Sequence, residues 1–266
     1  MSIEADITPP DYFSNTSIIL IEPQVPGNIG ATARAMKNMG FSRLVLVNPV
    51  EYRIVSEARW LAHGAEDVLD AAINVATLEE ALQGVKFVIG TTNRGREPWF
   101  NPIVPIRDAM SEGLRFMQEQ HIAILFGRED RGLPNDALEM CHRFVRIPAA
   151  IVHPSLNLSQ AVLICCYEIF LAAQKPHRPV WLKMAEVNDV ERVIMRIFEM
   201  MGLVGFVSRP TPETLLRSIR RVFRRAFRLE LRDVGTLHKI CDNIEYYVEH
   251  HKGKGVKGKK KTGKKT

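Results

Sequence analysis

The sequence predicts an α/β fold with a mainly parallel sheet, followed by a small all-helical domain. Short β-branched or apolar runs alternate with helical patterns over residues 1–174, and only helical patterns follow. This alternation is typical of strands joined by crossover helices, which place the strands parallel. An apolar content of 46% in a chain of 266 residues is sufficient for a substantial core.

Five runs bounded by turn residues predict buried strands. They are Ile18–Ile21, Leu44–Val47, Val85–Ile89, Ile122–Phe126 and Phe144–Ile147. Helical spacing predicts helices at Ile29–Met39, Leu78–Leu82, Ile106–Gln120 and Ser155–Ala173. Because ligands bind beyond the carboxyl ends of parallel strands, we expect the site in the loops after Ile21, Ile89, Phe126 and Ile147.

A polar, proline-bearing segment at residues 174–179 cannot continue the preceding helix and predicts a domain boundary. Residues 1–174 then form the α/β domain, and residues 175–251 form a helical domain. Its helices are predicted at Asn188–Met201, Pro212–Arg228 and Val234–His250.

Residues 252–266 are mainly lysine and glycine, which are too polar to pack, so we expect a disordered tail. Without the eight lysines of this tail the net charge falls from +6 to −2. Attraction to nucleic acid must therefore come from local patches and from the tail, which would bind polyanions without reading sequence.

Composition disfavours several classes of protein. The N-terminus has acidic residues and prolines where a secretory signal would be basic and then apolar, so we expect a cytoplasmic protein. The longest mostly apolar run, residues 161–173, is shorter than the roughly 20 residues of a membrane span. The cysteines lack the spacing of a zinc site or a disulfide scaffold, so we expect reduced thiols and no metal.

Three segments place polar residues at the predicted site edge. In PGNIGATARAMKNMG, the Gly27–Gly30 turn enters a helix that Asn28 is suited to cap, and Arg34 follows one to two turns later. Such a turn is also common in purely structural roles, and GNIG lacks the GxGxxG spacing of a dinucleotide fold.

The second segment, FGREDRGL, has four consecutive charges after Gly127. Charged loops usually face solvent, but a glycine at a strand end also allows a ligand to approach the backbone closely. In the third segment, IPAAIVHPSLNLSQAVLI, an apolar run brings Ser155, Asn157 and Ser159 to the start of a long helix, where Ser155 is also an ordinary N-cap candidate.

Together and in this order, the three segments resemble the motifs of the SPOUT class of RNA methyltransferases, and within it the TrmH-like 2'-O-ribose methyltransferases. NIGATAR matches the NxGxxxR pattern, FGREDRGL the GxExxGL pattern, and SLN the core of the third motif. The resemblance implies S-adenosyl-L-methionine as cofactor and a homodimer with active sites completed across the interface. It also implies a trefoil knot in the C-terminal part of the α/β domain, an exception to the usual rule against knots.

The resemblance further implies roles for single residues. The implied catalytic residues are Asn28, Arg34, Glu129, Ser155 and Asn157. The implied cofactor-binding residues are Thr91, Thr92, Asn93, Gly127, Ile147, Pro154, Ser155, Leu156 and Asn157. Because arginine is a poor base, we expect Arg34 to position the RNA phosphate and ribose rather than to deprotonate the hydroxyl. His153 beside this motif is left without a role.

Between Leu215 and Arg232, helical spacing places apolar residues on one arc and arginines on the other. The candidate RNA ligands are Arg217, Arg220, Arg221, Arg224, Arg225 and Arg228, with Arg232 beyond them. With no acidic neighbour on their side, we expect these charges to repel one another unless an RNA backbone neutralises them, although a merely solvated face is the plain alternative. This segment resembles the C-terminal helical domain of a tRNA-methylating branch of the family.

The resemblance therefore implies an enzyme that methylates a ribose 2'-hydroxyl in tRNA, at nucleotide 32 of the anticodon loop. Two alternatives stay open: the same reaction on ribosomal RNA, and an RNA-binding protein that keeps the fold without turnover. A dehydrogenase is disfavoured because no phosphate-binding glycine fingerprint follows a strand with a partner acid downstream.

Overall fold

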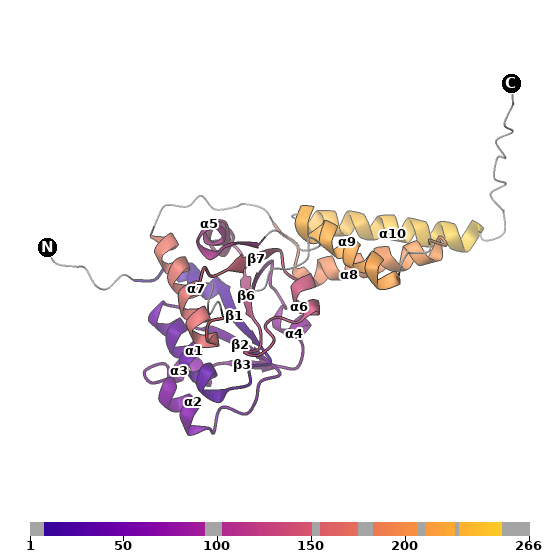
Figure 1. Ribbon diagram of the computed structural model, residues 1–266. Helices are drawn as coiled ribbons and strands as arrows, with labels where there is room; N and C mark the ends of the chain where they lie inside the picture. Colours follow the sequence, from indigo (N-terminus) through magenta and orange to yellow (C-terminus); the bar gives the residue numbers. More distant parts are fainter. Residues whose placement is uncertain are drawn as a thin grey trace.

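The computed structural model describes residues 8–93, 103–150, 155–174, 183–206, 211–226 and 229–251. Within these ranges, seven strands form one sheet in the order β3-β2-β1-β6-β4-β7-β5, and every neighbouring pair is parallel. The predicted α/β fold with a parallel sheet is confirmed (Figure 1).

The five predicted strands are confirmed, with bounds shifted by up to two residues. They are β1 (Thr16–Ile21), β2 (Arg43–Val47), β4 (Phe87–Thr91), β6 (Ile122–Phe126) and β7 (Arg143–Arg146). The sheet also contains β3 (Ile73–Val75) and β5 (Ile103–Pro105), two outer strands not predicted from the sequence. Three residues are too few to show an alternating pattern, and β3 lies at the rim of the sheet with Ile73 exposed.

Helices cover both faces of the sheet. One face packs against α1 (Pro26–Asn38), α2 (Ser56–Leu61), α3 (Glu66–Asp70), α5 (Ile106–Met117) and α7 (Leu158–Ala173). The other face packs against α4 (Leu78–Ala81) and α6 (Asn135–Glu139), and a short 3-10 helix, η1 (Asp11–Asn15), precedes β1. Side chains alternate along β1, so that Ile18 and Leu20 enter the first core while Ile19 and Ile21 enter the second.

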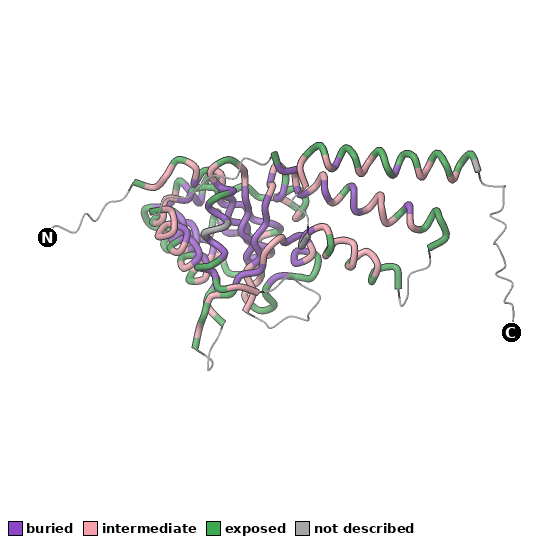
Figure 2. The backbone as a smooth tube through the Cα atoms, turned by 90° about the horizontal axis from the view of Figure 1, so that it is seen from above, coloured by how far each residue is buried: buried purple, intermediate pink, exposed green. Residues whose placement is uncertain are grey.

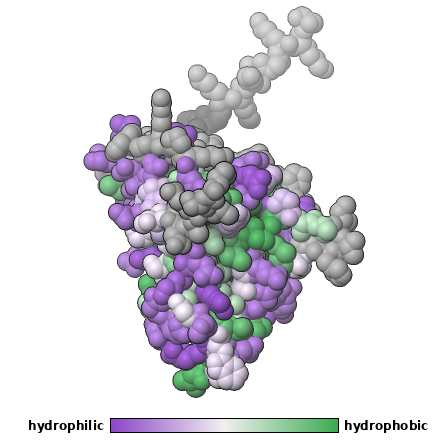
Figure 3. All heavy atoms as spheres, turned by 90° about the vertical axis from the view of Figure 1, so that its left-hand side faces the viewer, coloured by the Kyte–Doolittle hydropathy of each residue, from purple (hydrophilic) through white to green (hydrophobic). Residues whose placement is uncertain are grey.

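The close approach of α1 to α2 requires Gly30. A Cβ atom at this position would lie 1.9 Å from the carbonyl oxygen of Ala58. Any side chain at position 30 would therefore push α2 away from the helix that carries the first motif. Beside α1, α7 exposes Leu163 and Tyr167, and apolar side chains lie among polar ones on this side of the molecule (Figure 3).

The three predicted C-terminal helices are confirmed as α8 (Val187–Leu203), α9 (Pro212–Ala226) and α10 (Leu231–His251). They extend away from the α/β part, with α8 packed against both α9 and α10. Their small core contains Val190, Val193, Ile194 and Val234. Most of the other residues of these helices are partly or largely exposed to solvent (Figure 2). The predicted domain boundary after residue 174 falls where the described residues stop. The lysine tail lies outside them.

The start of α8 is fixed to the amino-terminal end of β4. The amide of Val187 donates to the carbonyl of Val85 at 2.9 Å, and Lys86 pairs with Glu186 at 3.2 Å. All four cysteines are free and buried. In the described ranges, the helices are all too short or too polar to cross a membrane.

Candidate functional site

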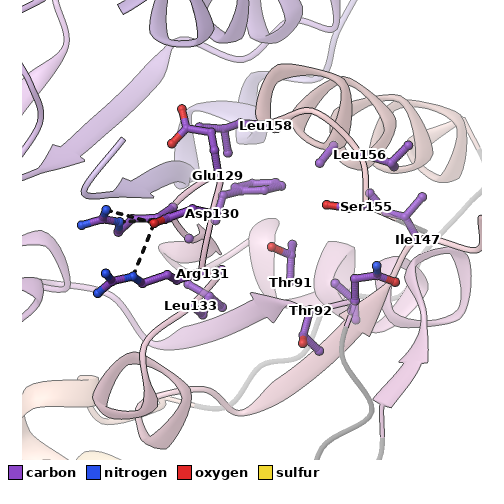
Figure 4. A pocket seen from close by; sticks show the side chains of 17 residues that line it. Thr91, Thr92, Glu129, Asp130, Arg131, Leu133, Ile147, Ser155, Leu156 and Leu158 are labelled. Atoms are coloured by element: carbon purple, nitrogen blue, oxygen red, sulfur yellow. Dashed lines mark hydrogen bonds and ion pairs between the residues drawn. The ribbon is translucent and has the colours of Figure 1, made fainter. Parts of the chain in front are cut away.

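A cavity of about 280 Å³ opens at the carboxyl edge of the sheet, the edge that the strand pattern indicates for a site. Its walls come from the end of β4, the loop between β6 and α6, the end of β7 and the segment that enters α7 (Figure 4). The cavity brings together eight of the predicted site residues: Thr91, Thr92, Asn93, Gly127, Glu129, Ile147, Ser155 and Leu156. Pro154 and His153 lie outside the described residues.

The cavity combines apolar walls with a few polar groups. Leu133, Val145 and Leu158 also line it; they were not predicted, because apolar residues at strand and helix ends carry no distinguishing signal. The Thr91 hydroxyl donates to the carbonyl of Leu125 at 2.9 Å and is therefore engaged in holding β4 to β6. Asn93 differs, because its Oδ1 is buried and has no hydrogen-bond partner among the described residues.

The loop between β6 and α6 folds back on itself. The amide of Gly132 donates to the carbonyl of Arg128 at 2.8 Å, and Gly132 adopts a φ of +70°. A Cβ atom on Gly127 would lie 2.0 Å from the backbone of Gly132. Gly127 is thus required by the closure of its own loop, because backbone atoms of Gly132 and Leu133 occupy the space that a side chain would need.

The same loop is tied to the end of β1 by Arg128. This guanidinium lies 3.2 Å from a carboxylate oxygen of Glu22 and contacts both carboxylate oxygens of Asp130, at 3.0 and 3.2 Å. The hydrogen bond from Arg128 lowers the pKa of the Asp130 carboxyl, and the bonds to Asp130 and Glu22 raise the pKa of Arg128. Ion pairs therefore hold charged side chains of this loop in place, and the four consecutive charges are not all freely solvated.

Residues from all three motifs form one hydrogen-bonded series. Glu129 accepts from the amide of Gln24 at 3.1 Å and from the Asn28 side chain at 2.8 Å. Asn28 in turn accepts from Asn157 Nδ2 at 2.8 Å, and Asn157 Oδ1 accepts from the Ser159 amide and hydroxyl at 2.9 and 2.8 Å. These bonds fix the orientation of both asparagine amides; Glu129 lines the cavity, whereas Asn28 and Asn157 are not among its lining residues.

Two predicted helix caps are wrong. The N-cap position of α1 is Val25, without a side-chain bond, and Asn28 lies inside the first turn, where its side chain turns to Glu129. The N-cap of α7 is Asn157 and not Ser155, because the helix begins at Leu158. Ser155 is thereby left exposed at the cavity, and its hydroxyl points inward (Figure 4).

Arg34 stands apart from this series. Its side chain is exposed on α1 and does not line the cavity of its own chain. It makes neither a hydrogen bond nor an ion pair with the described residues. Asn28 and Arg34, six residues apart on one helix, lie about 120° apart around its axis, so they face different directions.

The expectation that the α9 arginines lack acidic neighbours is wrong. Glu139 of α6 pairs with Arg217 and Arg220, and Glu191 of α8 pairs with Arg220 and Arg224. These acids come from other elements, so the helical pattern of α9 alone could not reveal them.

Arg224 also corrects the predicted RNA-binding set. Its side chain is only 3% exposed, with Nη2 at 3.1 Å from Glu191 and with Nε and Nη1 lacking partners among the described residues. Burial lowers its pKa, against the opposing effect of Glu191. A group enclosed in this way cannot contact RNA in this arrangement. The Arg225 side chain and Arg228 lie outside the described part of the chain.

No group of three or more His, Cys, Asp or Glu side chains within the described ranges has the arrangement of a metal site.

Comparisons with known proteins place these features in context. The model of the SpoU rRNA Methylase family matches residues 15–167. The tRNA (cytidine/uridine-2'-O-)-methyltransferase TrmJ of Yersinia enterocolitica is 37% identical over 258 residues, which cover 94% of this chain and 98% of the relative. TrmJ of Klebsiella pneumoniae is 39% identical, over 90% of this chain and 99% of the relative. The crystal structure of TrmJ from Z. mobilis superposes with a TM-score of 0.75 at 29% identity, over 86% of this chain and 99% of that chain.

Proposed function

Because this chain belongs to the SpoU methylase family, together with its TrmJ relatives, we propose that it methylates a ribose 2'-hydroxyl in tRNA, with S-adenosyl-L-methionine as methyl donor. The observation that carries the proposal is the hydrogen-bonded series of Glu129, Asn28 and Asn157, which meets the cavity at Glu129. It joins the three motifs at the carboxyl edge, where parallel sheets bind their ligands.

The cavity residues fit the proposed donor. A buried acceptor without a partner, Asn93 Oδ1, matches an amino or hydroxyl group of an adenosine, and Leu133, Val145 and Leu156 offer apolar walls for its base. When bound there, the donor supplies a methyl group on a cationic sulfur, so the acceptor hydroxyl is the group that needs positioning.

The protein side of the reaction is then mainly orientation. Ser155 projects a hydroxyl into the cavity, and the fixed amides of Asn28 and Asn157 offer polar groups for the ribose. Arg34 holds the neighbouring phosphate through its guanidinium and places the hydroxyl in line with the methyl group. A permanently charged arginine suits this role better than that of a base, and orientation can contribute on the order of 7 to 11 kcal/mol.

Arg34 is exposed and does not line its own cavity, which supports a homodimer in which each Arg34 serves the cavity of the other copy. The surface of α7 supports the same arrangement. Leu163 and Tyr167, one turn apart, are 38% and 46% exposed on a helix that is apolar nearly all round. A second copy would cover this surface.

The remaining predictions belong to the same proposal. Residues 1–174 would form the knotted catalytic domain, residues 175–251 the RNA-binding domain and residues 252–266 a disordered tail. The arginines available to RNA would include Arg217 and Arg221, and the target would be nucleotide 32 of a tRNA in the cytoplasm. Arg217 is 66% exposed despite its pairing with Glu139, and Arg221 carries no ion pair with the described residues, which supports their role.

The test is to incubate the protein with labelled donor and unmodified tRNA, and to map the product by mass spectrometry. We expect one 2'-O-methylated ribose, at position 32. Methylation of a base, or methylation only of ribosomal RNA offered in parallel, would contradict the proposal. Absence of any methyl transfer, with both RNAs bound, would favour a protein that binds RNA without turnover.

A further inference from the structure

We infer that Glu22 and Arg128 are positioning residues whose ion pair holds the loop between β6 and α6 against the segment joining β1 to α1, so that Glu129 can orient Asn28. This inference rests on the proposed function, and it concerns two residues outside the predicted set of site residues. Neither lies in the series of Glu129, Asn28 and Asn157, yet both are adjacent to it in the chain or in space.

The backbone of Glu22 is strained. Its φ is +48°, in the left-handed region that non-glycine residues rarely adopt. Its amide donates to Val47 at 2.8 Å and its carbonyl accepts from the Gln24 side chain at 2.8 Å, so this conformation is fixed from both sides. Strain of this kind persists where surrounding contacts impose it, and it is concentrated at functional sites.

Arg128 is the residue that bonds the carboxylate of Glu22 in this conformation. Its side chain is only 24% exposed, and its planar guanidinium bonds Glu22 through Nη1 while Nε and Nη2 hold Asp130. This use of three nitrogens fixes the plane of the group more tightly than a single exposed ion pair would. The charge of Arg128 is therefore shared between its own loop and the end of β1.

The link to the site is the next residue in the chain. Glu129 accepts hydrogen bonds from the Gln24 amide and the Asn28 side chain, which lie two and six residues after Glu22. Arg128 and Glu129 thus both connect the loop between β6 and α6 to the segment that joins β1 to α1. Arg128 does so as a hydrogen-bond donor, and Glu129 does so as an acceptor. Loss of the Glu22–Arg128 pair would let the loop shift and would weaken the grip of Glu129 on Asn28, and small displacements at a reacting group are costly.

The test is a double-mutant cycle of Glu22→Gln and Arg128→Gln in the full chain, with turnover on tRNA measured at saturating substrates. We expect each single variant to lower kcat about ten-fold and the double variant to be no more than about two-fold slower than either, because both break the same Glu22–Arg128 pair. Donor KM should change by less than about three-fold. Arg128→Lys, which keeps the charge but not the fork, should recover only part of the rate.

A second variant separates positioning from stability. Glu22→Gly removes the carboxylate but accepts a φ of +48° without strain, so we expect a protein as stable as the wild type with the same loss of kcat. The matched control is Lys37→Gln, which breaks an exposed pair with Asp67 at 2.7 Å on the same helix as Asn28 and should leave turnover unchanged.

Hydrogen exchange of the Gln24 amide gives a readout independent of activity. We expect faster exchange in Arg128→Gln and in Glu22→Gly but not in Lys37→Gln. Full turnover in Glu22→Gly, multiplicative losses in the cycle, or unchanged Gln24 exchange would overturn the inference. If the wild type fails to methylate tRNA, the proposed function fails, while Gln24 exchange still decides whether the pair holds the loop.

Discussion

The helices α1 and α9 both carry arginines, but their surroundings differ. Arg34 on α1 is exposed and has no acidic partner among the described residues, whereas Arg224 on α9 is enclosed against Glu191 with Met140 and Val187 beside it. An exposed, unpaired guanidinium is available to a phosphate, while an enclosed one stabilises the packing of α9 on α8. The role of an arginine here depends on acids contributed by other elements, and not on its own helix.

The largest expected effect comes from Arg34→Ala. Removal of an exposed side chain should leave the thermal midpoint unchanged but lower kcat about 10³-fold or more, with RNA affinity nearly unaltered, because orientation and not binding is lost. Turnover and filter binding on the same preparation measure both quantities. Arg59→Ala on α2, which breaks an exposed pair with Asp70, is the matched control. A parallel loss of affinity and kcat would instead make Arg34 a plain RNA ligand.

On α9 the expected change is in stability. Glu191→Ala removes the acid that faces Arg224 and leaves a buried guanidinium uncompensated, so we expect a loss of about 3 to 5 kcal/mol in chemical denaturation. Adding Arg224→Met should recover most of this loss, since an apolar group then fills the site. A cost below about 1 kcal/mol for Glu191→Ala would show that Arg224 reaches solvent.

Arg221→Ala is the counterpart on the same helix. Because Arg221 has no ion pair in the described part of the chain, its removal should leave stability within about 0.5 kcal/mol. RNA affinity should fall a few-fold, with a shallower dependence on salt. Binding titrations at two salt concentrations measure this, and an unchanged salt dependence would remove Arg221 from the RNA-binding surface.

A dependence on pH is expected for the α/β part alone. Burial, together with the nearby charge of Arg43, lowers the pKa of His121 to about 4, where its Nε2 lies 2.8 Å from the Ser17 hydroxyl. In the unfolded chain this imidazole takes up a proton near pH 6.5, so the unfolded state binds more protons between about pH 4 and 6.5. Stability is complete above pH 6.5 and decreases as the pH falls toward 4. Thermal midpoints across this range should show a smaller decrease in His121→Gln, and identical slopes would exclude His121 as the source.

Most of the fold follows from local patterns. Buried strands such as Ile122–Phe126 are short continuous apolar runs, α7 is an apolar run too long for a strand, and α9 has clear helical spacing, so their positions were predictable. The short strand β3 and the small helices α2 and α6 are set by tertiary packing, which outweighs weak local preference in segments of three to six residues.

A site residue was predictable where its type and its position next to a strand or helix indicate its place. It was not predictable where its role depends on a bond to a residue far away in the chain. Thr91, Gly127 and Ser155 could be placed at the carboxyl edge from their positions after strands or before a helix. The bonds of Asn28 to Glu129 and of Arg220 to Glu139 join residues 101 and 81 positions apart. Such pairings depend on how α1, α6 and α9 pack. The spacing of residue types along one helix therefore cannot predict them.

The attachment of α8 beside Val85 sets a minimum length for an RNA that contacts both the cavity and helices α8 to α10 of one chain. Val85 precedes β4 while Thr92 and Asn93 at its far end line the cavity, and a strand of five residues spans about 17 Å. An oligonucleotide too short to cover that span cannot touch the cavity and the outer helices of one chain together. Trimming the RNA stepwise should therefore produce a threshold in affinity and not a gradual decline.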